Sequence, residues 1–284
     1  MSTAEPTGLR RLASELTPTA IVCLAVIALA AFIAIFAPVI APYDEGTILT
    51  NESFASPGNG MLLGSDYLGR DIASRLGFGI RTTLSVALSI SVIAFLIGSA
   101  LGFFAAIMGG WTDTLVSRTV DALISFPAIM IALIVVSSLG SSFLVLIVTV
   151  AIIDSTRVFR VARALGMDIV VQDYIEAARV RGEGIWWIIW HELLPNALGP
   201  LAAEFGIRFT YAILFVSALS FLGLGVQPPH SDLGLMVKEN MQGLLYGSFS
   251  PLYPALAIAM VTVSTNILVD CYLKSTGANL PEEL

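Results

Sequence analysis

The sequence has little charge. Asp, Glu, Lys and Arg make up 12% of its 284 residues, about half of the roughly 25% that is typical of a soluble globular domain. Hydrophobic residues make up 56%, and four stretches contain no charged residue at all: 16–43, 82–110, 122–153 and 240–269. Each stretch exceeds the ~20 apolar residues that a helix needs to cross a bilayer. The composition excludes an ordinary soluble protein and predicts a membrane protein with several spans.

Lysine is almost absent, which excludes one class of site. A P-loop needs a lysine directly after a glycine-rich turn, so that its ammonium reaches the β- and γ-phosphates. The chain has only Lys238, which follows Leu-Met-Val, and Lys274, which follows Cys-Tyr-Leu. The chain is therefore predicted to perform no ATP chemistry of its own. It has no basic stripe either, which argues against nucleic acid as a partner.

Cysteine and histidine are equally scarce, with two of each. Cys23 and Cys271 fall within predicted spans, where we expect small embedded hydrophobes rather than a disulfide or a metal site. His191 and His230 are predicted on opposite sides of the membrane, so they cannot share a metal ion. The chain also lacks a Gly-x-Ser-x-Gly elbow and a His-Glu-x-x-His motif, which argues against an intramembrane enzyme.

Glycine and proline divide the apolar stretches into six predicted helices: 19–40, 82–108, 118–138, 143–164, 202–224 and 253–273. The first stretch is longer than the roughly 7–15 apolar residues of a signal peptide, so we expect it to be retained. Gly98, Gly102 and Gly109 predict close helix packing, within this bundle or against a partner. The predicted fold is all-α, with six transmembrane helices.

Arginine and lysine set the predicted orientation. With a cytoplasmic N-terminus, nine of these residues fall in inside segments and four in outside segments. The inside residues are Arg10, Arg11, Arg118, Arg157, Arg160, Arg163, Arg179, Arg181 and Lys274, and the outside residues are Arg70, Arg75, Arg81 and Lys238. Because positive residues are enriched in cytoplasmic loops, both termini and the segment 165–200 are predicted to be cytoplasmic.

The predicted cytoplasmic segment contains two short helices separated at Gly182. Asp173 can cap the first helix, with Glu176 three residues later. The second helix is predicted over 185–194 and to stop before Pro195. Such an element suits a contact with a soluble partner, but an interfacial anchor with tryptophans at headgroup depth explains the residues equally well.

Spaced residues of this segment resemble a known motif. Glu-Ala-Ala, a glycine after three more residues, and a later Leu-Pro are similar to the cytoplasmic EAA loop of bacterial ABC importer permeases. In that family the loop forms a coupling helix that docks into a cleft on the ATPase subunit. The resemblance implies this coupling role for Glu176, Ala177, Ala178, Gly182, Leu194 and Pro195.

Two further segments resemble the dipeptide/oligopeptide/nickel group of these permeases. Residues 64–75 read GSDYLGRDIASR, and residues 217–229 read SALSFLGLGVQPP. The short N-terminus and the chain length resemble the C-type subunit of dipeptide permease pairs, and the resemblance extends over about 20–277. The chain departs from the group after the double proline, where Ser-Asp-Leu-Gly stands in place of Ser-Trp-Gly, and at Arg181, which is usually apolar. These departures put the cargo in doubt rather than the family.

The resemblance implies a type I ABC importer permease fold in a bacterial inner membrane, and a transporter subunit rather than an enzyme. It implies an N-terminal part (1–81), a transmembrane permease core (82–277) and a cytoplasmic tail (278–284). The core would form half of a translocation pathway for dipeptides or oligopeptides. The implied partners are a second homologous permease, an extracytoplasmic solute-binding protein and two ATP-binding cassette subunits. Those cassette subunits would bind ATP and Mg²⁺, with no cofactor in this chain.

Two alternatives stay open at this point. One is the same class of transporter carrying nickel or another small solute. The other is an ion-coupled secondary transporter, which needs coupling-ion residues near mid-membrane. Asp154 with Arg157, and Glu204 with Arg208, are spaced to neutralise one another on a helix face, which favours a structural role over a proton relay.

Charged pairs also occur in the predicted outside segment. Asp66 with Arg70, and Asp71 with Arg75, are i,i+4 neighbours. They predict an amphipathic helix on the membrane surface, with docking of an external binding protein as the alternative. The loop 225–252 is an equally plausible docking or gating element.

Overall fold

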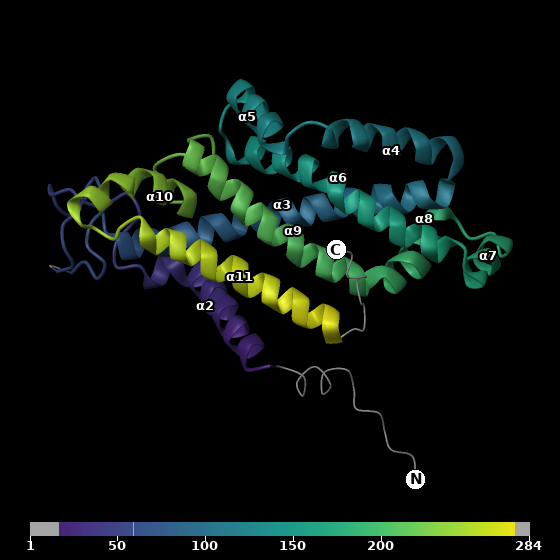
Figure 1. Cartoon of the computed structure of the whole chain (residues 1–284), viewed down its shortest axis with the longest axis horizontal. Coiled ribbons are helices and arrows are strands. Elements are labelled where there is room, and N and C mark those ends of the chain that lie inside the picture. The colour runs from purple at the N-terminus through teal and green to yellow at the C-terminus, as the bar shows by residue number, and fades with distance from the viewer. Residues whose placement is uncertain (1–16, 59, 276–284) are drawn as a thin grey trace, which may run out of the picture.

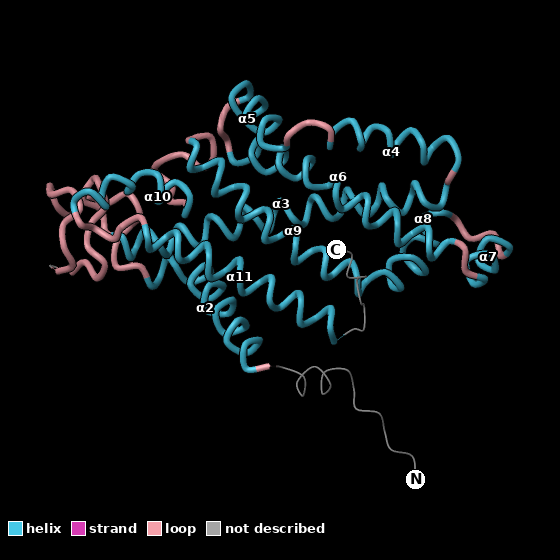
Figure 2. Tube along the Cα trace, viewed as in Figure 1, coloured by secondary structure: helices cyan, strands magenta, loops and turns pink. Residues whose placement is uncertain are grey.

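The computed structural model describes residues 17–58 and 60–275, which form a bundle of helices (Figure 1). The helices are α2 (Pro18–Ile40), α3 (Ile72–Met108), α4 (Gly110–Ile124), α5 (Ala128–Leu139), α6 (Phe143–Val170), α7 (Asp173–Val180), α8 (Ile185–Ile188), η1 (Ile189–Leu193), α9 (Leu194–Leu222), α10 (Leu233–Asn240), η2 (Met241–Tyr246) and α11 (Leu252–Ser275). The described residues contain no β-strand, only isolated bridges such as that between Ile48 and Arg70 (Figure 2). The predicted all-α class is confirmed. Arg10, Arg11 and the tail 278–284 lie outside the described residues.

The long helices run side by side. Figure 1 shows α3, α6 and α9 in the middle of the molecule, with α2 and α11 on one side and α4 and α5 on the other. The segments 41–71 and 225–251, both predicted to be outside, lie together at one end, and α7 lies at the opposite end. The start of α2 and the end of α11 both point toward the α7 end. Both ends of the described chain therefore lie toward the same end of the bundle.

Small residues bring α3 and α6 close together. A Cβ atom added to Gly98 would lie 2.6 Å from the carbonyl oxygen of Ser155, and one added to Gly102 would lie 2.8 Å from that of Phe159. Real Cβ atoms do not approach a carbonyl so closely, so both positions require glycine. The predicted close packing therefore occurs within this bundle. Gly109 has no neighbour within 4 Å of such an atom and takes no part in it.

Replacing Gly98 with leucine is expected to destabilise the bundle. The side chain would push α3 away from α6, and overpacking of this kind costs about 1–3 kcal/mol or more. The measurement is the midpoint of thermal unfolding in detergent, which should fall by several degrees. Gly46→Leu is the control, because a Cβ there meets nothing within 4 Å. Equal midpoints for the two variants would contradict the packing role of Gly98.

The third predicted span, 118–138, is wrong as a single helix. The chain bends by 82° between α4 and α5. Pro127 lies at the bend, and proline removes a backbone donor and disfavours helical geometry in the residue before it. Among the described residues, four helices are long and apolar enough to cross a membrane, and the bent pair is a fifth candidate. Helix α6 is 28 residues long but carries several charges, so composition does not mark it as the sixth.

The amphipathic helix predicted around Asp66 and Arg70 is also wrong. Residues 66–70 form a turn, and α3 begins at Ile72, ten residues before the predicted start at 82. Asp71 is the N-cap of α3, and its side chain accepts a hydrogen bond from the Ser74 amide. A capping aspartate satisfies a donor that the first turn of the helix leaves free. This cap fixes where the helix starts.

Two details of the segment 165–200 differ from expectation. The N-cap of α7 is Gln172 rather than Asp173, which is the first residue of the helix and makes no side-chain cap. The second helix does not stop before Pro195. It continues through a π-helical turn, Ile189–Leu193, directly into α9. Proline has no amide donor. The wider π-helical turn ahead of Pro195 lets the helix continue without that hydrogen bond.

Candidate coupling segment and transport site

Helix α7 lies against the bundle through one face. Ile175 and Ala178 are fully buried, and they belong to a hydrophobic cluster that includes Phe103 of α3, Ala162 of α6 and Leu193. Residues three apart share a face of a helix, so the buried pair forms a continuous apolar contact. Helix α7 is thereby joined to α3, α6 and the start of α9.

The other face of α7 is open. Glu176 and Ala177 are exposed, and a hollow of about 420 Å³ lies beside Glu176. The hollow is lined by Val170, Val171, Gln172, Glu176, Arg179 and Val180. Asp173 and Glu176 place negative charge in the first turn, where the helix dipole favours it. This face offers one carboxylate, one arginine and small apolar side chains to a partner.

The remaining residues of the EAA motif mark the ends of the segment. Gly182 has φ +81° and its amide bonds to the Arg179 carbonyl at 2.9 Å, so it ends α7 in a conformation that disfavours any side chain. Leu194 is half-buried against the same cluster as Ala178. Pro195 is exposed at the start of α9. The structure thus joins Ala178 and Leu194 through one cluster and leaves Pro195 at the surface.

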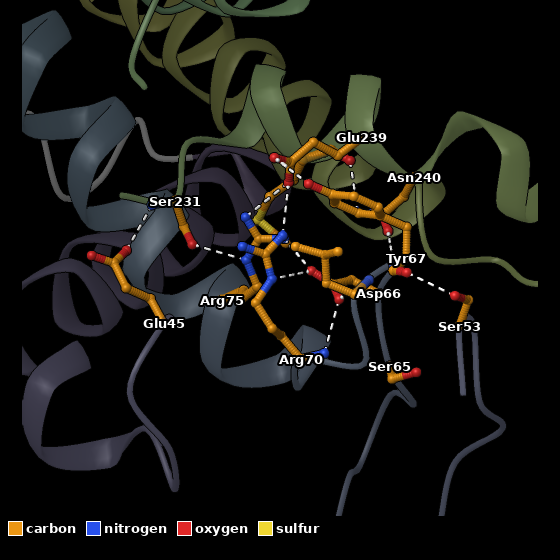
Figure 3. Close-up of polar contacts among 12 residues, drawn as sticks. Glu45, Ser53, Ser65, Asp66, Tyr67, Arg70, Arg75, Ser231, Glu239 and Asn240 are labelled. Atoms are coloured by element: carbon orange, nitrogen blue, oxygen red, sulfur yellow. Dashed lines mark hydrogen bonds and ion pairs between the residues drawn. The ribbon is translucent and has the colours of Figure 1, made fainter. Parts of the chain in front are cut away.

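At the opposite end of the molecule, four charged side chains form a buried cluster (Figure 3). Arg70 Nε lies 2.7 Å from Asp66 Oδ2, and Arg75 Nη2 lies 3.0 Å from Glu239 Oε2. Arg75 also contacts Asp66, and Arg70 contacts Glu239 at 3.2 Å. Tyr67 donates a hydrogen bond to Glu239 at 3.3 Å, and burial raises the pKa of this phenol. The cluster fastens the outside segment to α10.

The sequence predicted only part of this cluster. The Asp66–Arg70 pair is confirmed, but Asp71 pairs with Ser74 instead of Arg75. Glu239 was not predicted, because it is separated from Arg75 by more than half the chain and no local spacing links them. We call Asp66, Arg70, Arg75 and Glu239 the outer charge cluster.

Further contacts hold the loop 225–252 to α3. Asp232 accepts a hydrogen bond from Thr83 at 2.7 Å and caps α10 at the Leu235 amide. Burial raises the pKa of Asp232. His230 lies 3.0 Å from Glu45, which ties the same loop to the segment after α2. The loop is therefore held to the rest of the protein at several points.

A second charge group lies where α6 meets α9. The predicted Glu204–Arg208 pair is confirmed, with Oε1 and Nε 2.7 Å apart. The predicted Asp154–Arg157 pair is wrong, because Asp154 faces α9 and lies 3.4 Å from Arg208. Arg157 instead stacks over the Tyr211 ring, 5.1 Å from its centroid. A partner on a neighbouring helix cannot be read from spacing along one helix.

An apolar cavity of about 580 Å³ lies inside the bend between α4 and α5, against α6. Leu123, Phe126, Pro127, Ile131, Val148 and Ile152 supply much of its wall. Ser125, Thr149 and Thr156 add hydroxyl groups, and Arg157 adds a charge. The size and the mixed lining suit a small organic solute.

Within residues 17–58 and 60–275, no group of three His, Cys, Asp or Glu side chains is placed to hold a metal ion. His191 stacks on Trp187 with ring centroids 4.7 Å apart, near α7. His230 lies at the other end of the molecule, against Glu45. The two histidines are therefore far apart in the fold.

Known protein families match most of the chain. Residues 98–275 match the family described as "Binding-protein-dependent transport system inner membrane component". Residues 17–57 match the "N-terminal TM domain of oligopeptide transport permease C". The first match covers the end of α3 and all of α4 to α11, and so includes α7 and the cavity wall.

Individual relatives agree over nearly the same range. The glutathione transport system permease protein GsiD of Pectobacterium atrosepticum is 33% identical over 84% of this chain and 79% of its own length. The di/tripeptide transport system permease protein DppC of Pseudomonas aeruginosa is 34% identical over 84% and 81%. The dipeptide transport system permease protein DppC of Alkalihalophilus pseudofirmus is 32% identical over 88% and 83%. The chain therefore belongs to the inner-membrane permease components of binding-protein-dependent ABC transport systems, and it is a transporter subunit rather than an enzyme.

Proposed function

We propose that this chain forms half of the translocation pathway of an importer for dipeptides or oligopeptides, and that α7 couples it to separate ATPase subunits. The observation that carries the coupling role is the way α7 is held. Ile175 and Ala178 are fully buried on the bundle, whereas Glu176 and Ala177 are exposed. A helix fixed by one face and open on the other can bind a moving partner and pass the movement on as a rigid body.

The residues of the EAA motif have different roles in the proposed coupling. Glu176 and Ala177 contact the ATPase subunit. Ala178 and Leu194 pass the displacement to α3, α6 and α9 through their shared hydrophobic cluster. Gly182 and Pro195 hold the two ends of the segment, the first as a left-handed turn and the second at the start of α9.

Peptide cargo is supported by the names of the relatives. They are permeases for glutathione, dipeptides and di/tripeptides, and the N-terminal match is to an oligopeptide permease. The cavity of about 580 Å³ between the α4–α5 bend and α6 has room for a cargo of this size.

The proposed assembly has four kinds of chain. A second homologous permease completes the pathway, two ATP-binding cassette subunits bind ATP and Mg²⁺, and an extracytoplasmic solute-binding protein delivers the cargo. No cofactor is proposed for this chain itself. The excess of arginine near the α7 end supports a cytoplasmic position for that end and for both termini.

Reconstitution tests the proposal. The complex purified with its partner subunits is placed in liposomes, and uptake of tri-alanine and hydrolysis of ATP are measured with the binding protein present. We expect uptake that requires ATP and hydrolysis that rises with the loaded binding protein. Uptake by this chain alone, driven by an ion gradient and indifferent to ATP, would identify a secondary transporter. ATP-driven uptake of Ni²⁺ but of no peptide would overturn the proposed cargo alone.

A further inference from the structure

Arg157 differs from the other arginines of α6. Arg160 lies 2.8 Å from Asp121, and Arg163 lies 2.6 Å from Asp113. Among the described residues, no carboxylate comes within ion-pair distance of Arg157, whose guanidinium rests on the Tyr211 ring. It is the fifteenth of the 28 residues of α6, and therefore lies near the middle of the helix. A charge at such a depth is costly and is usually retained for a function.

The position of Arg157 links two hollows. It lines the cavity of about 580 Å³ and also a smaller one of about 60 Å³, which is bounded by Asp154 and Tyr211. Of the described residues that line the larger cavity, Arg157 is the one that carries a charge. The larger cavity therefore presents an apolar wall with a single cation on it.

The neighbouring carboxylates do not remove this charge from the wall. Asp154 and Glu204 are 9% and 8% exposed, and both lie against Arg208 on the buried side. Arg157 and Tyr211 are exposed, and Arg157 lines the larger cavity whereas Tyr211 lines the smaller one. The negative charges are thus turned inward and the positive charge outward. An anionic ligand group that enters the cavity meets the cation first.

We propose that Arg157, supported by the Tyr211 ring, binds the C-terminal carboxylate of the peptide as it crosses the membrane. This inference rests on the proposed peptide cargo. The guanidinium has a planar fork of donors that matches a carboxylate with two parallel hydrogen bonds. Stacking on an aromatic ring holds the fork in one plane without using any of its donors. The apolar walls receive the side chains of the peptide, which explains how one site accepts several sequences.

The first test compares two cargoes that differ only in this group. Uptake of tri-alanine and of tri-alanine amide is measured in liposomes with the complete transporter, each at saturating concentration of its binding-protein complex. Arg157→Gln is expected to lower uptake of tri-alanine at least tenfold relative to wild type and to change uptake of the amide less than twofold. Arg160→Gln is the matched control, one turn further on, and should leave the ratio of the two cargoes unchanged.

The second test needs no binding protein. Ser125 lines the same cavity and is exposed, so a cysteine there, with Cys23 and Cys271 replaced by alanine, reports on its occupancy. We expect tri-alanine to slow maleimide labelling of Ser125→Cys in the purified complex, and the amide to have no effect. Adding Arg157→Gln should abolish the protection.

The possible failures can be told apart. If the wild type takes up neither cargo, the proposed function fails. If uptake of both cargoes falls equally in Arg157→Gln and both protect the cysteine equally, the inference alone fails, and Arg157 pairs with the partner permease or a lipid instead. No fall in uptake and no protection would also overturn it.

Discussion

Glu176→Lys is expected to abolish ATP-driven uptake while the chain remains inserted and folded. Glu176 is exposed on α7 and makes no contact that holds the helix in place. Losing its favourable position in the first turn costs about 0.3–1 kcal/mol, which is small beside the burial of Ile175 and Ala178. The substitution therefore acts on the surface that we propose to bind the ATPase subunit, where a reversed charge is costly.

Two measurements check this result. Co-purification of the ATPase subunits should fall at least tenfold, and uptake should fall to the level without ATP. The control is Asp168→Lys, which makes the same charge change at an exposed position at the same end of the molecule but on α6. If both variants lose the ATPase subunits equally, the effect is one of general charge and α7 is not the specific contact.

The second large effect is expected at the outer charge cluster. Arg75→Met leaves Asp66 with one cation instead of two and removes a contact of Glu239, in a site where Arg75 itself is 1% exposed. Removing one partner of a buried ion pair typically costs about 3–5 kcal/mol, because the remaining charge stays buried without compensation. We expect the outside segment and α10 to separate and the protein to be lost from the membrane.

The measurements are the amount of protein in the membrane and the midpoint of thermal unfolding in detergent. The midpoint should fall by ten degrees or more, or the variant should not accumulate. Arg118→Met is the control, because Arg118 is exposed and forms no ion pair with any described residue. A normal midpoint for Arg75→Met would mean that Arg70 alone can satisfy both carboxylates.

Most of the helices could be predicted from the sequence, because the absence of charge over about 20 residues is itself the physical condition for crossing a bilayer. Close packing at Gly98 could be predicted for a similar reason, since only small residues allow such an approach, but its partner, α6, could not. The bend at Pro127 was missed because this proline stands inside an uninterrupted apolar stretch. There, the hydropathy predicts one continuous helix, whereas the backbone geometry of proline predicts a break.

The candidate sites were predicted unevenly. The EAA residues were found through their spacing and family resemblance, and the structure adds that Ala178 and Leu194 share a cluster. The partners of Asp154 and Arg75 were not found. Arg208 and Glu239 reach them from other helices, and local spacing carries no information about contacts of that kind. Of the charge pairs predicted from spacing, Asp66 with Arg70 and Glu204 with Arg208 are confirmed.

The bend at Pro127 also sets a condition on its surroundings. Helix α4 has 15 residues and α5 has 12, so at ~1.5 Å per residue neither piece alone crosses the roughly 30 Å of hydrocarbon. If the bent pair forms one span, the interrupted backbone at 125–127 lies within the membrane. Acyl chains cannot supply the hydrogen bonds that such a backbone needs, so lipid cannot be its final neighbour. This face of the chain therefore needs a water-filled cavity or another protein surface as its neighbour.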